Sequence, residues 1–173
     1  MSSEILTLVG VILLLILASA FFSSAETALT AASDARMRQL AGKGNRRARL
    51  VERLRDDREG LIGSILIGNN AVNVIASALA TSVFISVLDD AGVLWATITM
   101  TVILVVFAEV MPKTYALTYS DKYALAIAPS VRVVVIVLSP LSIALRMLAS
   151  SLIRKQAMGD AERAAALPRR RED

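Results

Sequence analysis

The sequence contains no cysteine and no histidine among its 173 residues. The chain therefore forms no disulfide, and it lacks the thiolate and imidazole ligands that Zn²⁺ and other soft metals prefer. Ser-His-Asp and Cys-His catalytic centres are excluded as well, and no serine has a visible base beside it, which argues against an intramembrane enzyme. Any metal ion bound by this chain must be held by oxygen atoms.

Charged residues are also scarce. They make up 20% of the sequence while apolar residues make up 55%, and the mean hydropathy is +0.62. Soluble domains average about 25% charged and about 45–50% apolar residues, spread along the chain. Here the apolar residues come in blocks and the charges lie outside them. The composition predicts an all-α integral membrane protein.

Three apolar blocks are predicted to cross the membrane, at about residues 5–26, 61–88 and 92–111. The first contains an 18-residue run, Ile5 to Phe22, which suits a hydrocarbon core of roughly 30 Å. It lacks the basic flank of a cleaved signal peptide. The second and third blocks are separated only by Asp89-Asp90, which predicts a tight turn between antiparallel helices.

A fourth block, residues 123–152, is long enough to span but contains Pro129, Pro140 and Arg132. Prolines break or kink helices, and a charge at membrane depth is costly. We therefore expect a broken juxtamembrane helix that lies at the membrane interface. A charged tail, residues 153–173, follows it.

Residues 34–59 contain nine basic and five acidic residues. The positive-inside rule predicts that this segment and the basic tail are cytoplasmic, while the N-terminus, without Lys or Arg, is outside. A chain with its N-terminus outside and its C-terminus inside must cross the membrane an odd number of times, which agrees with three spans. Apolar residues at helical spacing, interrupted by a Gly- and Asn-containing turn, predict a cytoplasmic helical hairpin at headgroup level. A solvated charged loop is the alternative.

Polar residues within the apolar blocks form three clusters, each costly in a membrane without a partner or a function. The first consists of Ser23, Ser24 and Glu26, at the inner end of the first block. The serine hydroxyls could donate oxygen atoms to an ion or bond back to the helix carbonyls. Alternatively, the serines are helix-packing residues and Glu26 simply lies at the interface.

The second cluster is Gly68, Asn69, Asn70 and Asn73. An unpaired amide in hydrocarbon costs several kcal/mol, so these side chains must face protein, water or an ion. One continuous helix cannot aim all three asparagines at one point, but a break at Gly68-Asn69 would let a backbone and a side-chain carbonyl converge. The alternative is hydrogen bonding between helices.

The third cluster is Glu109, Pro112 and Lys113, at the inner end of the third block. Pro112 has no N–H and is predicted to distort the turn that holds Glu109. The alternative is that Glu109 forms a salt bridge with Lys113 or with Arg132.

Taken together, the clusters offer hydroxyl, amide and backbone oxygen atoms and a carboxylate, a set that suits Mg²⁺, Ca²⁺ or Na⁺. One carboxylate against a dication leaves the site positively charged, which favours weak binding and release. Distorted helices that expose carbonyl groups are also how secondary transporters build ion sites. The pattern favours transport over storage.

Three motifs now support a resemblance. FFSSAETALTA (Phe21 to Ala31), LIGNNAVN (Leu66 to Asn73) and FAEVMPKTYA (Phe107 to Ala116) occur in the order and spacing of the CorC/CNNM (cyclin M) family of magnesium transporters. Nearly the whole chain resembles the N-terminal transmembrane domain of a bacterial CorC-like protein. The resemblance implies Mg²⁺ efflux coupled to Na⁺ entry, a homodimer, and an inward-facing Mg²⁺ site between the helices, in the bacterial inner (plasma) membrane.

Two sets of residues follow from matching these motifs. The resemblance implies that the Mg²⁺ ligands are Ser23, Gly68 through its carbonyl, Asn69, Asn70 and Glu109. The resemblance also implies a second set of residues, which either bind Na⁺ or hold the Mg²⁺ ligands in place. These are Ser24, Glu26, Asn73, Pro112 and Lys113.

Members of this family continue into paired CBS domains, which bind nucleotide, whereas this sequence ends at Asp173. We therefore expect residues 1–173 to be a truncated piece that comprises the ion-transport domain. Its expected partners are the lipid bilayer, a second copy and the CBS domains of the full-length chain. Nucleic acid is not expected, because headgroup phosphates account for the basic segment. The alternative functions are a membrane-anchored Mg²⁺ sensor, a dimeric anchor for regulatory domains, or a passive cation channel.

Overall fold

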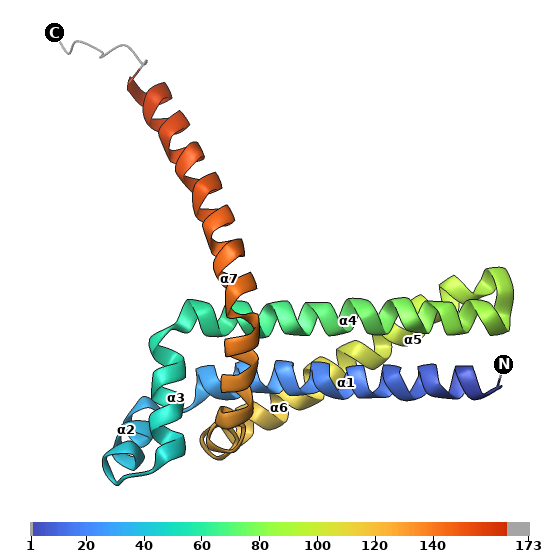
Figure 1. Cartoon of the computed structure of the whole chain (residues 1–173), viewed down its shortest axis with the longest axis horizontal. Helices are drawn as coiled ribbons and strands as arrows, with labels where there is room; N and C mark the ends of the chain where they lie inside the picture. The colour runs from blue at the N-terminus through green and yellow to red at the C-terminus, as the bar shows by residue number, and fades with distance from the viewer. Residues whose placement is uncertain (1, 166–173) are drawn as a thin grey trace.

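The structure is a computed structural model that describes residues 2–165, and these residues form helices without any strand (Figure 1). In chain order the elements are α1 (Ser2–Ala31), α2 (Asp34–Gly42), α3 (Arg46–Asp56), α4 (Arg58–Leu88), the 3-10 turn η1 (Asp89–Ala91), α5 (Gly92–Ile103), the π-helix η2 (Leu104–Val110), α6 (Met111–Thr118) and α7 (Ser120–Ala165). The predicted all-α fold is confirmed.

The body of the molecule is an antiparallel bundle of α1, α4 and the arm formed by α5, η2 and α6 (Figure 1). With 31 residues, α4 is about 46 Å long at 1.5 Å per residue, which exceeds the thickness of the hydrocarbon core. The chain reverses at η1, where Asp89 has a φ of 49°. The tight turn predicted at Asp89-Asp90 is therefore present.

Three helical segments among the described residues are long and apolar enough to cross a membrane: Ser3–Ala31, Arg58–Thr118 and Ser120–Ala144. The second folds back at η1 and so contains both arms of the hairpin. Large apolar side chains on these segments are exposed, including Leu14, Leu17, Val74 and Val102. Because water disfavours such a surface and lipid does not, the chain is a multi-pass membrane protein.

The helix α7 corrects one prediction. It is continuous from Ser120 to Ala165 through both Pro129 and Pro140, so the break expected within residues 123–152 is absent. Pro129 is exposed while Ala128 and Val131 on the inner face are buried, so packing on both sides holds the helix together. Figure 1 shows α7 lying across one end of the bundle, steeply inclined to α1 and α4. Part of the predicted tail, residues 166–173, lies outside the described residues.

The basic segment forms two short helices, α2 and α3, at the same end of the bundle. Gly44 has a φ of 90°, and the Asn45 side chain caps α3 by accepting hydrogen bonds from the backbone N–H groups of Arg47 and Ala48. Met37 and Val51 are buried where the two helices meet. The predicted helical pair is present, and packing explains why it is not a solvated loop.

Candidate ion-binding site

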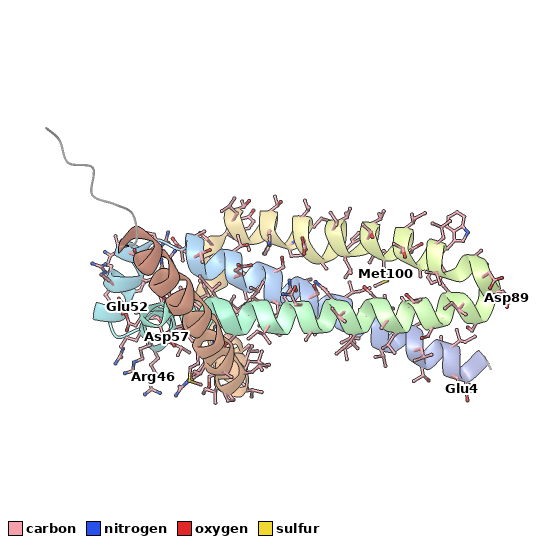
Figure 2. All side chains as sticks on the ribbon, turned by 90° about the horizontal axis from the view of Figure 1, so that it is seen from above. Glu4, Arg46, Glu52, Asp57, Asp89 and Met100 are labelled. Carbon is pink, nitrogen blue, oxygen red and sulfur yellow. The ribbon has the colours of Figure 1, made fainter. Side chains whose placement is uncertain are left out.

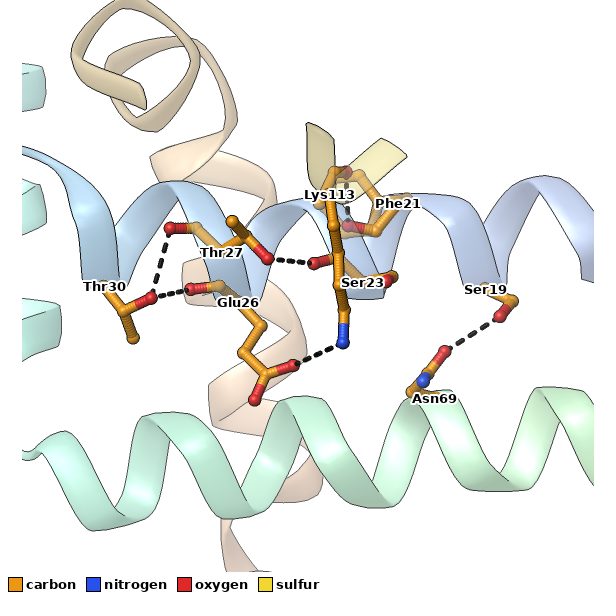
Figure 3. A network of polar contacts seen from close by, with 9 residues as sticks. Ser19, Phe21, Ser23, Glu26, Thr27, Thr30, Asn69 and Lys113 are labelled. Carbon is orange, nitrogen blue, oxygen red and sulfur yellow. Dashed lines mark hydrogen bonds and ion pairs between the residues drawn. The ribbon is translucent and has the colours of Figure 1, made fainter. Parts of the chain in front are cut away.

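A polar stripe runs along the face of α1 that looks toward α4, as Figure 3 shows. It consists of Ser19, Ser23, Glu26 and Thr30, whose spacing of four, three and four residues keeps them on one side of a helix. Ser19 and Ser23 are completely buried. Ser19 and Ser23 therefore face protein, while Glu26 is partly buried and Thr30 is exposed.

The stripe is tied to α4 by one hydrogen bond. The Ser19 hydroxyl donates to the Asn69 side-chain oxygen over 2.9 Å (Figure 3). This is the contact between helices that the sequence offered as the alternative for the asparagines, and it occupies one lone pair of Asn69. Ser19 was missed by the sequence reasoning, although it lies four residues before Ser23 and interrupts an otherwise apolar run.

Two predicted residues have a buried oxygen atom without a partner. The Ser23 hydroxyl and the Asn73 side-chain carbonyl accept and donate no hydrogen bond within the described residues. Buried polar atoms in proteins nearly always have a partner, and an unpartnered one calls for an explanation such as an ion or a water molecule. Both atoms are therefore available at membrane depth as oxygen ligands.

Gly68 is buried where α4 meets α1 and α7. A Cβ atom at this position would lie 2.7 Å from the Phe22 ring and 3.2 Å from the Leu138 side chain. However, α4 is continuous through Gly68, so the break that would let a backbone and a side-chain carbonyl converge there is absent. Packing explains why residue 68 is glycine, because a residue without a side chain lets the helices approach closely.

This geometry predicts that Gly68→Ala destabilises the protein by about 1–3 kcal/mol, the usual cost of overpacking. The double variant Gly68→Ala with Phe22→Leu should recover part of the loss, because leucine lacks the ring atoms that the new Cβ meets. Thermal unfolding in detergent measures both effects. Gly10 is the matched control, since nothing lies within 4 Å of a Cβ placed there. Equal losses from Gly10→Ala and Gly68→Ala would contradict the packing role.

Glu109 lies on the π-helix η2, which packs against α1. The Met111 N–H donates to the Val106 carbonyl, five residues earlier, directly before Pro112. The distortion predicted from Pro112 is therefore present. Single π-turns inside α-helices occur frequently at functional sites, and here the irregular register changes the direction in which Glu109 leaves the helix.

Glu109 does not form the salt bridges that the sequence offered as its alternative role. Among the described residues, Lys113 pairs with Glu26 over 3.9 Å, and neither Lys113 nor Arg132 pairs with Glu109 (Figure 3). The Glu109 side chain is only partly buried. Its carboxylate is thus free of a structural ion pair within this part of the chain.

Ser24 and Pro112 line a groove of about 370 Å³ between α1, α6 and α7. The Ser24 hydroxyl lies 3.0 Å from the Phe21 carbonyl and 2.9 Å from the Tyr123 hydroxyl, so both contacts are taken by protein. This arrangement links α1 to α7. Tyr123 was not predicted, and as a single tyrosine at the start of an apolar block it carries no distinctive signal.

The structure brings some of the predicted residues together and leaves others apart. Ser23, Glu26, Asn69 and Lys113 gather in the space between α1 and α4 (Figure 3). The Asn70 side chain is exposed, since it lies about 100° around the helix from Asn69. Within the described residues no three acidic side chains converge, so an ion here would rely on hydroxyl, amide and backbone oxygen atoms beside at most two carboxylates.

The arrangement can now be set beside known proteins. The family described as the cyclin M transmembrane N-terminal domain matches residues 10–170. The chain belongs to the cyclin M (CNNM) family. The match covers the bundle except the first eight residues of α1, so the candidate site falls inside the cyclin M domain.

Several curated relatives share this cyclin M domain. The UPF0053 inner membrane protein YfjD of Escherichia coli (strain K12) is 47% identical over 106 residues, which is 61% of this chain and 25% of that protein. A UPF0053 protein of Haemophilus influenzae is 39% identical over 116 residues, 67% of this chain and 28% of the relative. The chain thus spans about a quarter of the length of these relatives.

Proposed function

We propose that this cyclin M domain transports Mg²⁺ out of the cell and that Na⁺ entry drives the transport. The observation that carries the proposal is the fully buried and unpartnered Ser23 hydroxyl on the polar stripe, opposite the asparagines of α4. A site for a hard cation needs such oxygen atoms, and this one lies one helical turn from the contact that Ser19 makes with Asn69 of α4.

The proposed ligands are the side chains of Ser23, Asn69 and Glu109 together with the Gly68 carbonyl, and Asn70 is left out of the set because its side chain is exposed on α4. Mg²⁺ requires near-octahedral coordination and usually retains several water molecules, so few protein ligands suffice. Glu26, Asn73, Pro112 and Lys113 would support these ligands or hold Na⁺, whereas both contacts of the Ser24 hydroxyl are taken by protein. The Lys113 ammonium beside Glu26 adds positive charge near the site, which weakens cation binding and assists release.

We place the domain in a bacterial inner membrane, with the N-terminus outside and the C-terminus in the cytoplasm. The printed name of the Escherichia coli relative places that protein in the inner membrane. The charge distribution supports the orientation, because Glu4 and Asp89 lie at one end of the bundle and Arg46 at the other (Figure 2). A homodimer, with CBS domains attached to each full-length chain, completes the proposal.

Proteoliposomes test the function with the 173-residue chain. We expect Mg²⁺ to leave loaded vesicles when Na⁺ is present outside and can enter down its own gradient. When a large organic cation replaces the external Na⁺, Mg²⁺ efflux should fall to the level of protein-free vesicles. An entrapped Mg²⁺ indicator dye measures the rate. Efflux that ignores the replacement would favour a passive channel. Protein that binds Mg²⁺ and moves none would favour a sensor or an anchor for regulatory domains.

A further inference from the structure

A groove of about 390 Å³ lies between α3 and the first half of α7, away from the polar stripe. Five arginines line it together with Leu50 and Pro129. Those arginines are Arg46, Arg47, Arg49 and Arg53 of α3 and Arg132 of α7. Positions 46, 49, 50 and 53 share one face of α3, so the helix turns most of its positive charge toward α7. We call this cavity the arginine groove.

The positive charge of the arginine groove is not neutralised by protein. The ion pairs of the described residues include Arg36 with Asp121, Arg55 with Asp34 and Lys113 with Glu26. None involves an arginine of the groove, and the one hydrogen bond given by these arginines runs from Arg49 to the Gly44 carbonyl. Five guanidinium groups held around one cavity attract an anion, and their planar donor sets suit phosphate.

The groove also adjoins an apolar surface. Directly after Arg132, the residues Val133, Ile136 and Val137 form an exposed strip on α7, and each is more than half exposed. Arg132 and Ile136 are four residues apart, so the arginine borders this strip. A free phosphate or a nucleotide would use only the charged part, whereas a phospholipid presents a phosphate and an acyl chain together.

We propose that the arginine groove binds the phosphate of an anionic phospholipid from the cytoplasmic leaflet, with an acyl chain along Val133, Ile136 and Val137. The bound lipid would bridge α3 and α7 and hold α7 across the end of the bundle, in the position seen in Figure 1. Basic pockets beside membrane helices commonly take such headgroups. The inference does not depend on which ion the domain transports.

Native mass spectrometry of the 173-residue chain tests the site. The chain is equilibrated with phosphatidylglycerol and with phosphatidylcholine of the same acyl chains, and the retained lipid is counted. We expect clear preference for phosphatidylglycerol. The triple variant R46Q/R53Q/R132Q should weaken phosphatidylglycerol retention by on the order of 100-fold, at roughly fivefold for each arginine removed.

The matched control is R38Q/K43Q/R58Q, which removes three positive charges from the same end of the protein without touching the groove. It should retain phosphatidylglycerol as the parent does. Arg132→Gln alone, on the α7 side, keeps the test available if the triple variant does not fold, and should cost roughly fivefold.

Three results would overturn the proposal. Equal retention of the two lipids by the parent would remove the headgroup preference, and equal losses in the control and groove variants would reduce it to general charge. Displacement of phosphatidylglycerol by an equal concentration of soluble glycerophosphate or ATP would assign the groove to a free phosphate or nucleotide, since it would leave the apolar strip without a role.

Discussion

Glu109→Gln is expected to abolish Mg²⁺ efflux while the protein still inserts into the membrane. Glutamine keeps the shape of the side chain and removes the negative charge that a dication needs. Loss of a supporting residue around a metal typically costs 10–100-fold in affinity, so the loss of a direct carboxylate ligand should cost at least about 100-fold. Mg²⁺ efflux from proteoliposomes, at equal amounts of inserted protein, measures the effect.

The fold should tolerate this change, because Glu109 forms no ion pair within the described residues and lies partly exposed on η2. We expect the thermal unfolding temperature in detergent to change little. Asp90→Asn is the matched control, since it removes one negative charge at the far end of the hairpin. Full efflux in a well-inserted Glu109→Gln protein would exclude the proposed role of this carboxylate.

Ser23→Ala is expected to separate function from stability. The Ser23 hydroxyl is buried without a partner, so its removal relieves an unsatisfied polar group and should leave the free energy of unfolding unchanged or raise it. Efflux should nevertheless fall, with the apparent affinity for Mg²⁺ weakened by about 10- to 100-fold. Denaturation in detergent and a Mg²⁺ titration of the efflux rate measure the two quantities.

The neighbouring serine is the control, because its hydroxyl has partners. Ser24 contacts the Phe21 carbonyl and the Tyr123 hydroxyl, so Ser24→Ala should cost about 1 kcal/mol of stability. Opposite patterns in two adjacent serines would be hard to produce by a general disturbance of α1. If Ser23→Ala destabilises the protein as much as Ser24→Ala does and leaves efflux intact, then Ser23 is a packing residue.

Much of the fold can be predicted from local patterns in the sequence. Four features depend on residues close together in the chain, and each is present: the apolar blocks, the Asp89-Asp90 turn, the Gly- and Asn-containing turn before α3, and the distortion before Pro112. The one failure concerns the continuity of α7, and the break considered at Gly68-Asn69 is absent as well. Gly68 and the prolines of α7 weaken a helix locally, but their neighbours pack against other helices and keep it intact.

The sequence predicted which residue types form the candidate site, but it did not predict which of them contact one another. Sequence spacing placed Ser23 and Glu26 on one helix, but it could not say that Ser19 reaches Asn69 or that Lys113 pairs with Glu26 and leaves Glu109 free. These contacts join residues 50 and 87 positions apart, and only the packing of α1 against its neighbours sets them.

By itself, the sequence determined that this protein is a helical membrane protein without Cys or His side chains, because composition and hydropathy require no knowledge of distant contacts. It also carried the motifs of the cyclin M family. The tertiary structure alone decided which oxygen atoms remain unpartnered, how α7 crosses the bundle, and that five arginines from two helices enclose one groove. Each of these depends on how separate helices pack, and packing in a membrane rests on van der Waals contacts and hydrogen bonds between residues that are far apart in the sequence.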